Sequence, residues 1–512
     1  MHQIHHDRMK NYDIIIVGAG AAGLMAATGA ASNGRKTLVL EKMPRPGRKI
    51  MITGKGRCNF TNLKQWNEFS SHIHPKPNFL KPSFYNLSSE KLIDFLQNNG
   101  LETVVERGDR AFPASHLATD VVDTLVKSAE NAGAAILCGK TVMEILHSGH
   151  CTEEDMPNVM SSGDGTSFIL KCSDGSTYSC RKLIICTGGL SYPATGSTGD
   201  GYRFATSFGH SIRTLFPSLT AIVPANYKII EKADDKAGRL IDGIGIFPPP
   251  GRGRERLGKW SSGPLQRAAT VGRAGVNGSN CPSAYPKGHI NRNTPLSDFG
   301  KSLCGNQLKN VSLSLIIDGN TAQEEFGDLD FTDGGMEGPT GFKVSRKCVN
   351  AIINGSRVTA ILDLKPAVDI DDLKNRIMRT WDEICKDRRN ASRQYKERFR
   401  ILLGKLMPMS LIPAFVKAHP NIDHKTLAKA LKSWKFDIAG YVGDERCVIT
   451  AGGVSCEELT AKTLESRLIP GLYFAGEVLD LDADTGGYNL QTAFSTGYLA
   501  GISAAKSCGT IR

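Results

Sequence analysis

The chain lacks any unbroken run of about 18 apolar residues, the length that a helix needs to cross a bilayer. Its first ten residues, Met1–Lys10, include three histidines but no apolar core like that of a signal peptide. We therefore expect neither a membrane span nor a secretory leader, and we interpret this segment as a solvated tail.

Paired cysteine motifs are also missing, although the chain contains 13 cysteines. No two cysteines have the C-x-x-C spacing of zinc clusters, and none have the C-x-x-x-x-C spacing of a flavin-linked redox disulfide. We therefore expect no metal site, and we expect most cysteines to be small buried side chains in a reducing cytoplasm. The chemistry must then come from a bound cofactor.

Acidic residues are in the minority, with 51 Asp and Glu against 63 Lys and Arg, for a net charge of +12. Ten of the cations and only two acids lie between Gly251 and Asn310. This local surplus argues against a chain that binds nucleic acid along its whole length. The length of 512 residues predicts two or three domains, and 40% hydrophobic residues are typical of a soluble globular protein.

The strongest positive signal lies near the start of the chain. An apolar run ending at Val17 predicts a buried strand, residues 18–23 read G-A-G-A-A-G, an alanine-rich helix follows, and a second strand, Thr37–Glu41, ends in an acid. In such a βαβ unit Gly18 permits a sharp turn, Gly20 lets a pyrophosphate approach the backbone, and Gly23 lets the helix pack closely on the sheet. The unit predicts dinucleotide binding, with phosphates at the helix N-terminus beside Ala22 and the adenosine ribose on Glu41.

A glycine-rich basic loop follows the second strand. Residues 47–62 contain three glycines and four cations together with small polar side chains, which suits a loop around an anionic ligand. From this loop we select Arg48, Gly54, Gly56, Arg57, Cys58 and Asn59 as cofactor-binding candidates. Cys58 is a possible reactive thiol beside the cofactor, but a packed cysteine is the favoured interpretation.

The rest of the first domain alternates helices and strands. Amphipathic spacing predicts helices over 88–99 and 116–132, which end at Gly100 and Gly133. Short strands follow within 135–179, and Lys182–Cys186 predicts a buried strand whose end, Gly188-Gly189, brings a second loop to the dinucleotide. We interpret the polar segment 191–202 as the exit from the nucleotide domain.

The composition changes at about Phe216. Strand-like stretches within 216–246 and 311–364 predict an inserted β-rich domain, and residues 369–434 are expected to be mainly helical. Between the two strand regions, Pro248–Gly305 has no apolar period, so we expect a disordered basic tract. Its arginines could hold RNA, but with few aromatic residues for stacking a solvated tract is favoured.

The last part of the chain returns to strands followed by glycines. Residues 448–454 and 471–480 are two such units, and the second contains Gly476, Glu477 and Asp480. Gly486, Gly487, Tyr488 and Asn489 then precede an alanine-rich helix. A helix N-terminus at this turn would stabilise negative charge on a reduced flavin ring.

Several strings at both ends of the chain are specific in combination. They are residues 17–23, 47–59, 111–113, 191–201, 451–454 and 471–489, with looser matches at 331–339 and 362–366. The chain resembles the YhiN-type (BaiN-like) family of bacterial NAD(P)/FAD-dependent oxidoreductases, some of which carry the label aminoacetone oxidase-like. One branch of that family is associated with reduction of steroid-type enones.

The resemblance implies an α/β fold: a Rossmann-like FAD domain of the two-dinucleotide-fold type, interrupted by an inserted domain of β-barrel and helices. The expected divisions are 1–210 and 441–512 for the FAD domain and 211–440 for the insert. The resemblance implies FAD contacts from Glu41, Lys42, Arg48, Asn59, a backbone group near Val142, Glu477, Asp480 and Asn489.

The leading functional hypothesis is an FAD oxidoreductase that moves hydride between NAD(P)H and a small organic acceptor such as a conjugated carbonyl. One alternative is an amine or α-aminoketone oxidase that passes electrons to oxygen, and another is an FAD-linked RNA-modifying or RNA-binding protein. No catalytic acid or base can be assigned from the sequence. Tyr488, His116 and Cys58 are candidates only because they lie near motifs, and the sequence does not indicate an oligomeric state.

Overall fold

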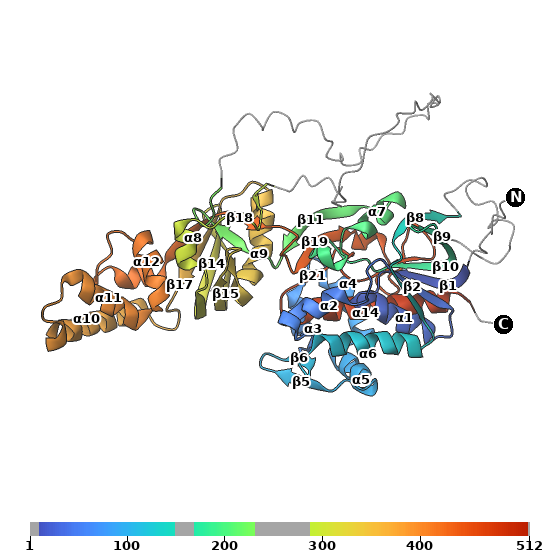
Figure 1. Cartoon of the computed structure of the whole chain (residues 1–512), viewed down its shortest axis with the longest axis horizontal. Helices are drawn as coiled ribbons and strands as arrows, with labels where there is room; N and C mark the ends of the chain where they lie inside the picture. Colours follow the sequence, from blue (N-terminus) through green and yellow to red (C-terminus); the bar gives the residue numbers. More distant parts are fainter. Residues whose placement is uncertain (1–9, 149–167, 231–286, 510–512) are drawn as a thin grey trace, which may run out of the picture.

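The structure is a computed structural model that describes residues 10–148, 168–230 and 287–509. The predicted N-terminal tail lies outside the described residues up to position 9, and the predicted basic tract lies outside them up to position 286. Figure 1 shows two lobes. The Rossmann lobe contains both ends of the described chain, and the inserted lobe is formed by the middle of the sequence.

The Rossmann lobe is built on a seven-stranded sheet in the order β7-β2-β1-β10-β9-β8, with β20 also pairing with β10. The strands β7, β2, β1, β10 and β20 are parallel, while β9 and β8 extend the sheet in antiparallel pairing. The apolar run of β1 is fully buried at its end, as expected for a parallel strand covered on both faces. The strands are β1 (Lys10–Val17), β2 (Thr37–Glu41), β7 (Ala135–Cys138), β8 (Val142–His147), β9 (Phe168–Cys172), β10 (Thr177–Ile185) and β20 (Leu472–Phe474).

Two helices from opposite ends of the chain lie against each other in this lobe. They are α1 (Ala21–Ala31) and α14 (Tyr488–Ser507), which Figure 1 shows next to the sheet. A Cβ atom at Gly497 would lie 2.1 Å from the Ala22 carbonyl oxygen, and one at Gly501 would lie 2.2 Å from that of Ala26. Only glycine permits this close approach, so these two positions hold the C-terminal helix on the dinucleotide motif.

The other helices of the Rossmann lobe include the two that the sequence predicts. They are α5 (Ser89–Asn98) and α6 (Ala118–Asn131), and the glycines that follow them, Gly100 and Gly133, have left-handed backbone angles, φ 87° and 99°. The remaining elements are α2 (Arg48–Ile52), β3 (Thr61–Asn62), α3 (Trp66–Phe69), β4 (Ile73–His74), α4 (Pro77–Asn86), β5 (Thr103–Glu106), β6 (Arg110–Pro113), α7 (Asp200–Ser207) and β21 (Asp482–Ala483).

The chain passes between the lobes twice, through two strands that pair with each other. These are β11 (Ile212–Ser218) on the way out and β19 (Ile449–Val454) on the way back, joined in an antiparallel two-stranded sheet. A Cβ atom at Gly452 would lie 2.1 Å from the Thr214 carbonyl oxygen, so the two connections are in tight contact. The two lobes are therefore joined by a pair of hydrogen-bonded strands and not by two separate linkers.

The inserted lobe contains a sheet whose strand pairing returns to its starting strand. The order is β12-β16-β15-β14-β17-β18, and β12 also pairs with β18, which closes the circuit of strand pairs. The β-barrel itself stays a prediction. The long helix α9 (Gly338–Ile353) packs along this sheet. The strands are β12 (Ile222–Pro224), β14 (Gln307–Ile317), β15 (Asn320–Phe331), β16 (Met336–Glu337), β17 (Val358–Asp363) and β18 (Trp434–Val442).

A group of helices between β17 and β18 forms the far end of the inserted lobe (Figure 1). The predicted helical character of 369–434 is confirmed: the helices are α10 (Ile370–Lys386), α11 (Tyr395–Leu406), α12 (Ile412–Ala418) and α13 (Leu427–Lys432). We call residues 370–432 the helical module. Across the described parts of the chain, no helix combines the length and apolar character needed to span a membrane.

The buried side chains form two separate cores. One extends from Ile14 to Phe208 and from Val454 to Cys508, and the other from Phe216 to Ala451. The expected division at about residues 210 and 440 stays a prediction.

The prediction of a disordered tract from 248 to 305 is wrong for its last part. Residues 289–290 form β13 (His289–Ile290), which pairs with β18, and α8 (Asp298–Leu303) follows, with its N-cap Ser297 accepting from the Gly300 N–H at 3.1 Å. Leu303 is fully buried in the inserted core. A few widely spaced apolar residues anchor this segment, and they are too few to give a periodic pattern.

Candidate cofactor site

A cavity of about 530 Å³ opens at the carboxyl ends of β1, β2 and β10. Ligands of open α/β sheets bind at this edge, outside the ends of the strands. The lining comes from both parts of the Rossmann lobe and from the connection to the inserted lobe. Twelve of the predicted residues line it: Gly18, Gly20, Ala22, Glu41, Lys42, Arg48, Gly54, Val142, Gly188, Gly476, Glu477 and Asn489.

The three glycines of the first turn differ in their surroundings. A Cβ atom at Gly18 would lie 2.5 Å from the Cys186 carbonyl oxygen, and one at Gly23 would lie 1.8 Å from that of Gly18. A Cβ atom at Gly20 would meet no other atom within 4 Å, because this glycine faces the open cavity. The turn is therefore packed at its two ends and open in the middle, where a phosphate would approach.

The start of α1 has no side-chain cap, although its first N–H groups have no partner within the helix. Those groups and the positive end of the helix dipole suit a phosphate. The structure thus leaves at this turn both the space and the donors that a pyrophosphate needs.

Glu41 fixes the turn to the end of β2. One of its carboxylate oxygens accepts from the Ala19 N–H at 2.7 Å and the other from the Met43 N–H at 2.8 Å. The side chain is almost buried, yet it lines the cavity. A carboxylate has about four acceptor positions, so these bonds leave room for the predicted ribose hydroxyls.

The charge of the cavity favours an anionic ligand. Six cations line it against three carboxylates, and Lys42 and Lys49 are paired with Asp200 at 2.6 Å and Glu477 at 2.7 Å. Within the part of the chain that the structure describes, Arg45, Arg48 and Lys55 have no carboxylate partner. The six cations are Lys42, Arg45, Arg48, Lys49, Lys55 and Lys140.

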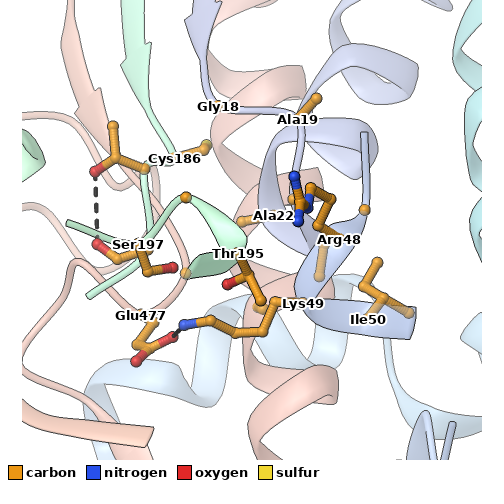
Figure 2. Close-up of a pocket in the computed structure, with 18 of the residues that line it drawn as sticks. Gly18, Ala19, Ala22, Arg48, Lys49, Ile50, Cys186, Thr195, Ser197 and Glu477 are labelled. Atoms are coloured by element: carbon orange, nitrogen blue, oxygen red, sulfur yellow. Dashed lines mark hydrogen bonds and ion pairs between the residues drawn. The ribbon is translucent and has the colours of Figure 1, made fainter. Parts of the chain in front are cut away.

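A hydrogen-bonded network connects the two parts of the Rossmann lobe with β19. Lys49 donates to Glu477 and, at 2.8 Å, to the Ser191 hydroxyl, and Glu477 also accepts from the Thr450 N–H at 3.0 Å. Figure 2 shows Lys49 and Glu477 directed toward each other. Sequence reasoning selected Glu477 but missed Lys49, Ser191 and Thr450. The only feature of the sequence that pointed to any of these three residues was the position of Lys49 inside the basic loop.

Tyr192 is a fourth residue that sequence reasoning missed. It lines the cavity with left-handed backbone angles, φ 50°, and its N–H donates to the Asp444 carbonyl oxygen at 2.9 Å. No described residue bonds its hydroxyl, and burial raises the pKa of this phenol above its ordinary value. Nearby, burial and the adjacent Glu445 raise the pKa of the Asp444 carboxyl to about 6.

The turn before α14 contributes to the cavity through residues on either side of its glycines. Thr485, Asn489 and Leu490 line the cavity, whereas Gly486 and Gly487 do not. The Asn489 amide is held by Ala483, accepting from its N–H at 2.9 Å and donating to its carbonyl oxygen at 2.8 Å.

Gly487 instead packs against the β3 segment, where a Cβ atom would lie 2.5 Å from the Thr61 backbone. The same Cβ atom would lie 2.9 Å from the Asn59 Oδ1 atom, a buried acceptor that has no hydrogen-bond partner. Asn59 does not line the cavity, so this buried acceptor is not assigned to its ligand.

The other predicted residues away from the cavity have packing or pairing partners elsewhere. Arg57 pairs with Glu106 and lies over the Phe112 ring at 4.5 Å, and Tyr488 stacks on His72 with ring centroids 4.3 Å apart. Cys58 is fully buried, and burial raises the pKa of its thiol to about 12, so it is not a reactive thiolate. The ten predicted residues that do not line the cavity are Gly23, Gly56, Arg57, Cys58, Asn59, Gly189, Asp480, Gly486, Gly487 and Tyr488.

The fold and the cavity together define a dinucleotide-binding flavoprotein of the Rossmann type. The family model described as "HI0933-like protein Rossmann domain" matches residues 12–503, so the chain belongs to this family. The predicted resemblance to the YhiN-type oxidoreductases is thereby confirmed, and the family is one of FAD-dependent oxidoreductases.

Curated relatives match over nearly the full length. The chain is 26% identical over 509 residues to the ribosomal RNA dihydrouridine synthase of Escherichia coli, covering 98% of this chain and 100% of that protein. It is 25% identical over 504 residues to the 3-dehydro-bile acid delta(4,6)-reductase of Clostridium scindens, covering 96% and 98%. Among solved structures, a flavocytochrome c3 fumarate reductase aligns with a TM-score of 0.42 at 14% identity, over 98% of this chain and 79% of that one.

Proposed function

We propose that this protein uses FAD and a reduced nicotinamide to reduce a carbon–carbon double bond conjugated to a carbonyl group. The observation that carries the proposal is that the cavity has two kinds of lining. One is the open Gly18–Ala22 turn, and the other includes Phe342, Val448 and Ile449, apolar side chains from α9 and the β19 connection. The turn suits a dinucleotide, and the apolar side chains suit an organic acceptor.

FAD, when bound, supplies the chemistry of taking a hydride from the nicotinamide and giving it to the substrate. The residues that would hold its diphosphate are the Gly18–Ala22 turn and the unpaired Arg45 and Arg48, and Glu41 would bind the ribose. Lys49 comes from the N-terminal part of the lobe and Glu477 from its C-terminal part, and both line the cavity. Their ion pair would therefore fix the position of the ligand between the two parts.

Reduction of a double bond also needs a proton at the carbon that does not receive the hydride. We assign this proton to the Tyr192 hydroxyl, since it borders the cavity and has no other described partner. A phenol is protonated at neutral pH, the form that can donate, and burial raises the pKa of Tyr192 further above that range. Lys49 is less suited, because Glu477 and Ser191 already accept its protons.

The names of the relatives support the type of bond. Dihydrouridine is uridine with its ring double bond reduced, and that bond is conjugated to a carbonyl. A delta(4,6)-reductase of a 3-dehydro bile acid likewise acts on double bonds conjugated to a ketone. Both relatives match this chain over nearly its whole length, so a shared reaction with different substrates is the simplest interpretation.

Anaerobic titration tests the proposal. We expect the purified protein to be yellow, and its flavin absorbance to be bleached by NADPH or NADH and restored by an enone such as a 3-oxo-4-ene steroid. Bleaching by an amine or α-aminoketone, with no response to either nicotinamide, would contradict the proposal and favour an amine oxidase.

The second candidate is the same reaction on a uracil base in RNA. Two observations favour it, the ribosomal RNA dihydrouridine synthase relatives from Escherichia coli and Haemophilus influenzae and the net charge of +12. Mass spectrometry of ribosomal RNA incubated with the reduced enzyme would detect the gain of two hydrogens. Restoration of the flavin absorbance by RNA but by no enone would select this candidate.

A further inference from the structure

The helical module has a charge surplus of its own. Its residues 370–432 include fifteen Lys and Arg against seven Asp and Glu. The chain therefore has a second basic region besides residues 251–310, and acidic residues elsewhere offset its charge in the total of +12. Figure 1 places this module at the end of the inserted lobe that faces away from the Rossmann lobe.

The surplus is concentrated on α11 and the turn that precedes it. Residues 386–405 contain eight cations and two acids. The apolar side of α11, including Phe399 and Leu403, is buried in the inserted core, while Arg393, Lys396 and Arg400 are exposed. A helix whose apolar side is already buried has no face to insert into a lipid surface, so its exposed cations suit a polyanion in water.

None of these exposed cations forms an ion pair in the described residues, and Arg393 interacts with Asp387 only at longer range, where it helps to lower the pKa of that carboxyl. By contrast, Arg398 donates to the Asn390 and Ala391 carbonyl oxygens, and Arg389 pairs with Asp387. Within the described residues no carboxylate lies within ion-pair distance of Arg393, Lys396 or Arg400. Like charges held close together without partners lower stability, so an external anion is the partner that would offset their repulsion.

Aromatic rings lie beside the cations. The Trp381 and His424 rings stack with centroids 4.7 Å apart and an interplanar angle of 11°, and Tyr395 lies against them with 45% of its surface exposed. The Tyr395 hydroxyl is 3.1 Å from the His424 Nδ1 atom, which holds its ring in place. An exposed ring fixed among unpaired cations is the combination on which unpaired bases stack.

We propose that the helical module is an RNA-docking surface, with Arg393, Lys396 and Arg400 on phosphates and Tyr395 on a base. The inference rests on the second substrate candidate, reduction of uracil in RNA. Beyond that candidate, the inference places the RNA-docking surface on a different lobe from the turn that would bind the dinucleotide. The substrate would then be a structured RNA large enough to contact both lobes, not a free nucleotide.

The test compares two triple variants of equal charge. Arg393→Gln/Lys396→Gln/Arg400→Gln changes the module, and Lys81→Gln/Lys127→Gln/Lys462→Gln changes three exposed lysines of the Rossmann lobe as the matched control. The affinity of each holoenzyme for in vitro transcribed ribosomal RNA is measured at several salt concentrations. The module triple should reduce the slope of log K against log salt by about 2 to 3, while the control triple should match the wild type. In both triples the bound flavin should be reduced by the nicotinamide at the wild-type rate.

A third variant separates stacking from charge. Tyr395→Leu retains an apolar contact with Phe399 but removes the ring, so it should weaken RNA binding about 5- to 100-fold with the salt slope unchanged. The proposal is overturned if the two triples bind RNA equally, or if the module triple loses binding to phosphatidylserine vesicles and the wild type binds no RNA. RNA binding that depends on the module without any uridine reduction would leave this surface established and reject the RNA substrate alone.

Discussion

At the scale of single residues, Gly20 and Gly23 provide a matched pair. Gly20→Val should fill the space that a diphosphate needs, so we expect no FAD binding but a folded protein, because nothing lies within 4 Å of the new Cβ atom. Gly23→Val should fail to fold, since its Cβ atom would lie 1.8 Å from the Gly18 carbonyl oxygen. Circular dichroism and flavin absorbance distinguish the two outcomes. A Gly20→Val protein that retains FAD would show that the phosphates lie elsewhere.

Tyr192→Phe tests the assigned proton donor. We expect the rate of substrate reduction to fall by about 10²- to 10⁴-fold, which is the usual contribution of a general acid. Flavin reduction by the nicotinamide should be unchanged, because that step needs no proton from this residue. Stopped-flow measurement of the two half-reactions separates these effects, and equal slowing of both would indicate a structural role for the ring.

Residues that act through local geometry were predictable, and residues that act through the tertiary structure were not. Gly18, Gly20 and Glu41 follow from spacing inside one βαβ unit. Lys49 and Thr450 acquire their roles only because the fold brings them to Glu477. Conversely, Tyr488 and Arg57 belong to the correct motifs, but their side chains pack against neighbouring rings outside the cavity. A motif therefore locates the loop and leaves the direction of each side chain open.

At the scale of elements, the pairing of β4 with β21 brings Asp484 between two histidines. His72 Nδ1 lies 2.8 Å from Asp484 Oδ2, and His74 Nε2 lies 3.3 Å from Oδ1. Burial opposes ionisation, but these hydrogen bonds outweigh it and lower the pKa of Asp484 to about 2. Because the folded pKa is below the unfolded value, the carboxylate stabilises the fold above about pH 4, and this contribution is lost as the pH falls through 2.

We therefore expect Asp484→Asn to lose about 2 kcal/mol of unfolding free energy at pH 7, and the difference from the wild type to shrink between about pH 4 and pH 2. Urea unfolding at a series of pH values measures it. Asp123→Asn, on an exposed position of α6, is the control that should show no such trend. A difference that does not change with pH would mean that the carboxylate charge contributes nothing.

Helices and strands were predicted correctly from the sequence where one apolar spacing extends over the whole segment. The helices α5 and α6 have clear apolar spacing and end at recognisable glycines, and α11 of the module ends two residues before Pro408. The segment 287–305 has only scattered apolar residues, of which Leu303 is fully buried, and β13 is too short to give any alternation. Its order depends on contacts with β18 and Tyr227, more than 60 residues away along the chain, which no local window contains.

At the scale of the whole molecule, one ion pair connects the lobes directly. Arg346 on α9 donates to both carboxylate oxygens of Asp482 on β21, at 2.8 and 3.1 Å, and the Asp482 side chain is fully buried. Arg346→Met should therefore cost about 3 to 5 kcal/mol, since it leaves a buried carboxylate unpaired. Arg346→Met/Asp482→Leu should recover most of the loss. Thermal unfolding measures both, and equal melting temperatures for the two variants would contradict this account.

The close contact between α1 and α14 has a consequence for how the protein is made. A ribosome produces α1 more than 450 residues before α14, so the face of α1 that Gly497 and Gly501 of α14 contact stays uncovered during most of synthesis. The inserted lobe has its own core and closes its sheet before the last helix exists. We therefore expect flavin to bind only after the final helix has emerged. A nascent chain stalled before residue 488 would then contain a folded inserted lobe and an incomplete Rossmann lobe without bound flavin.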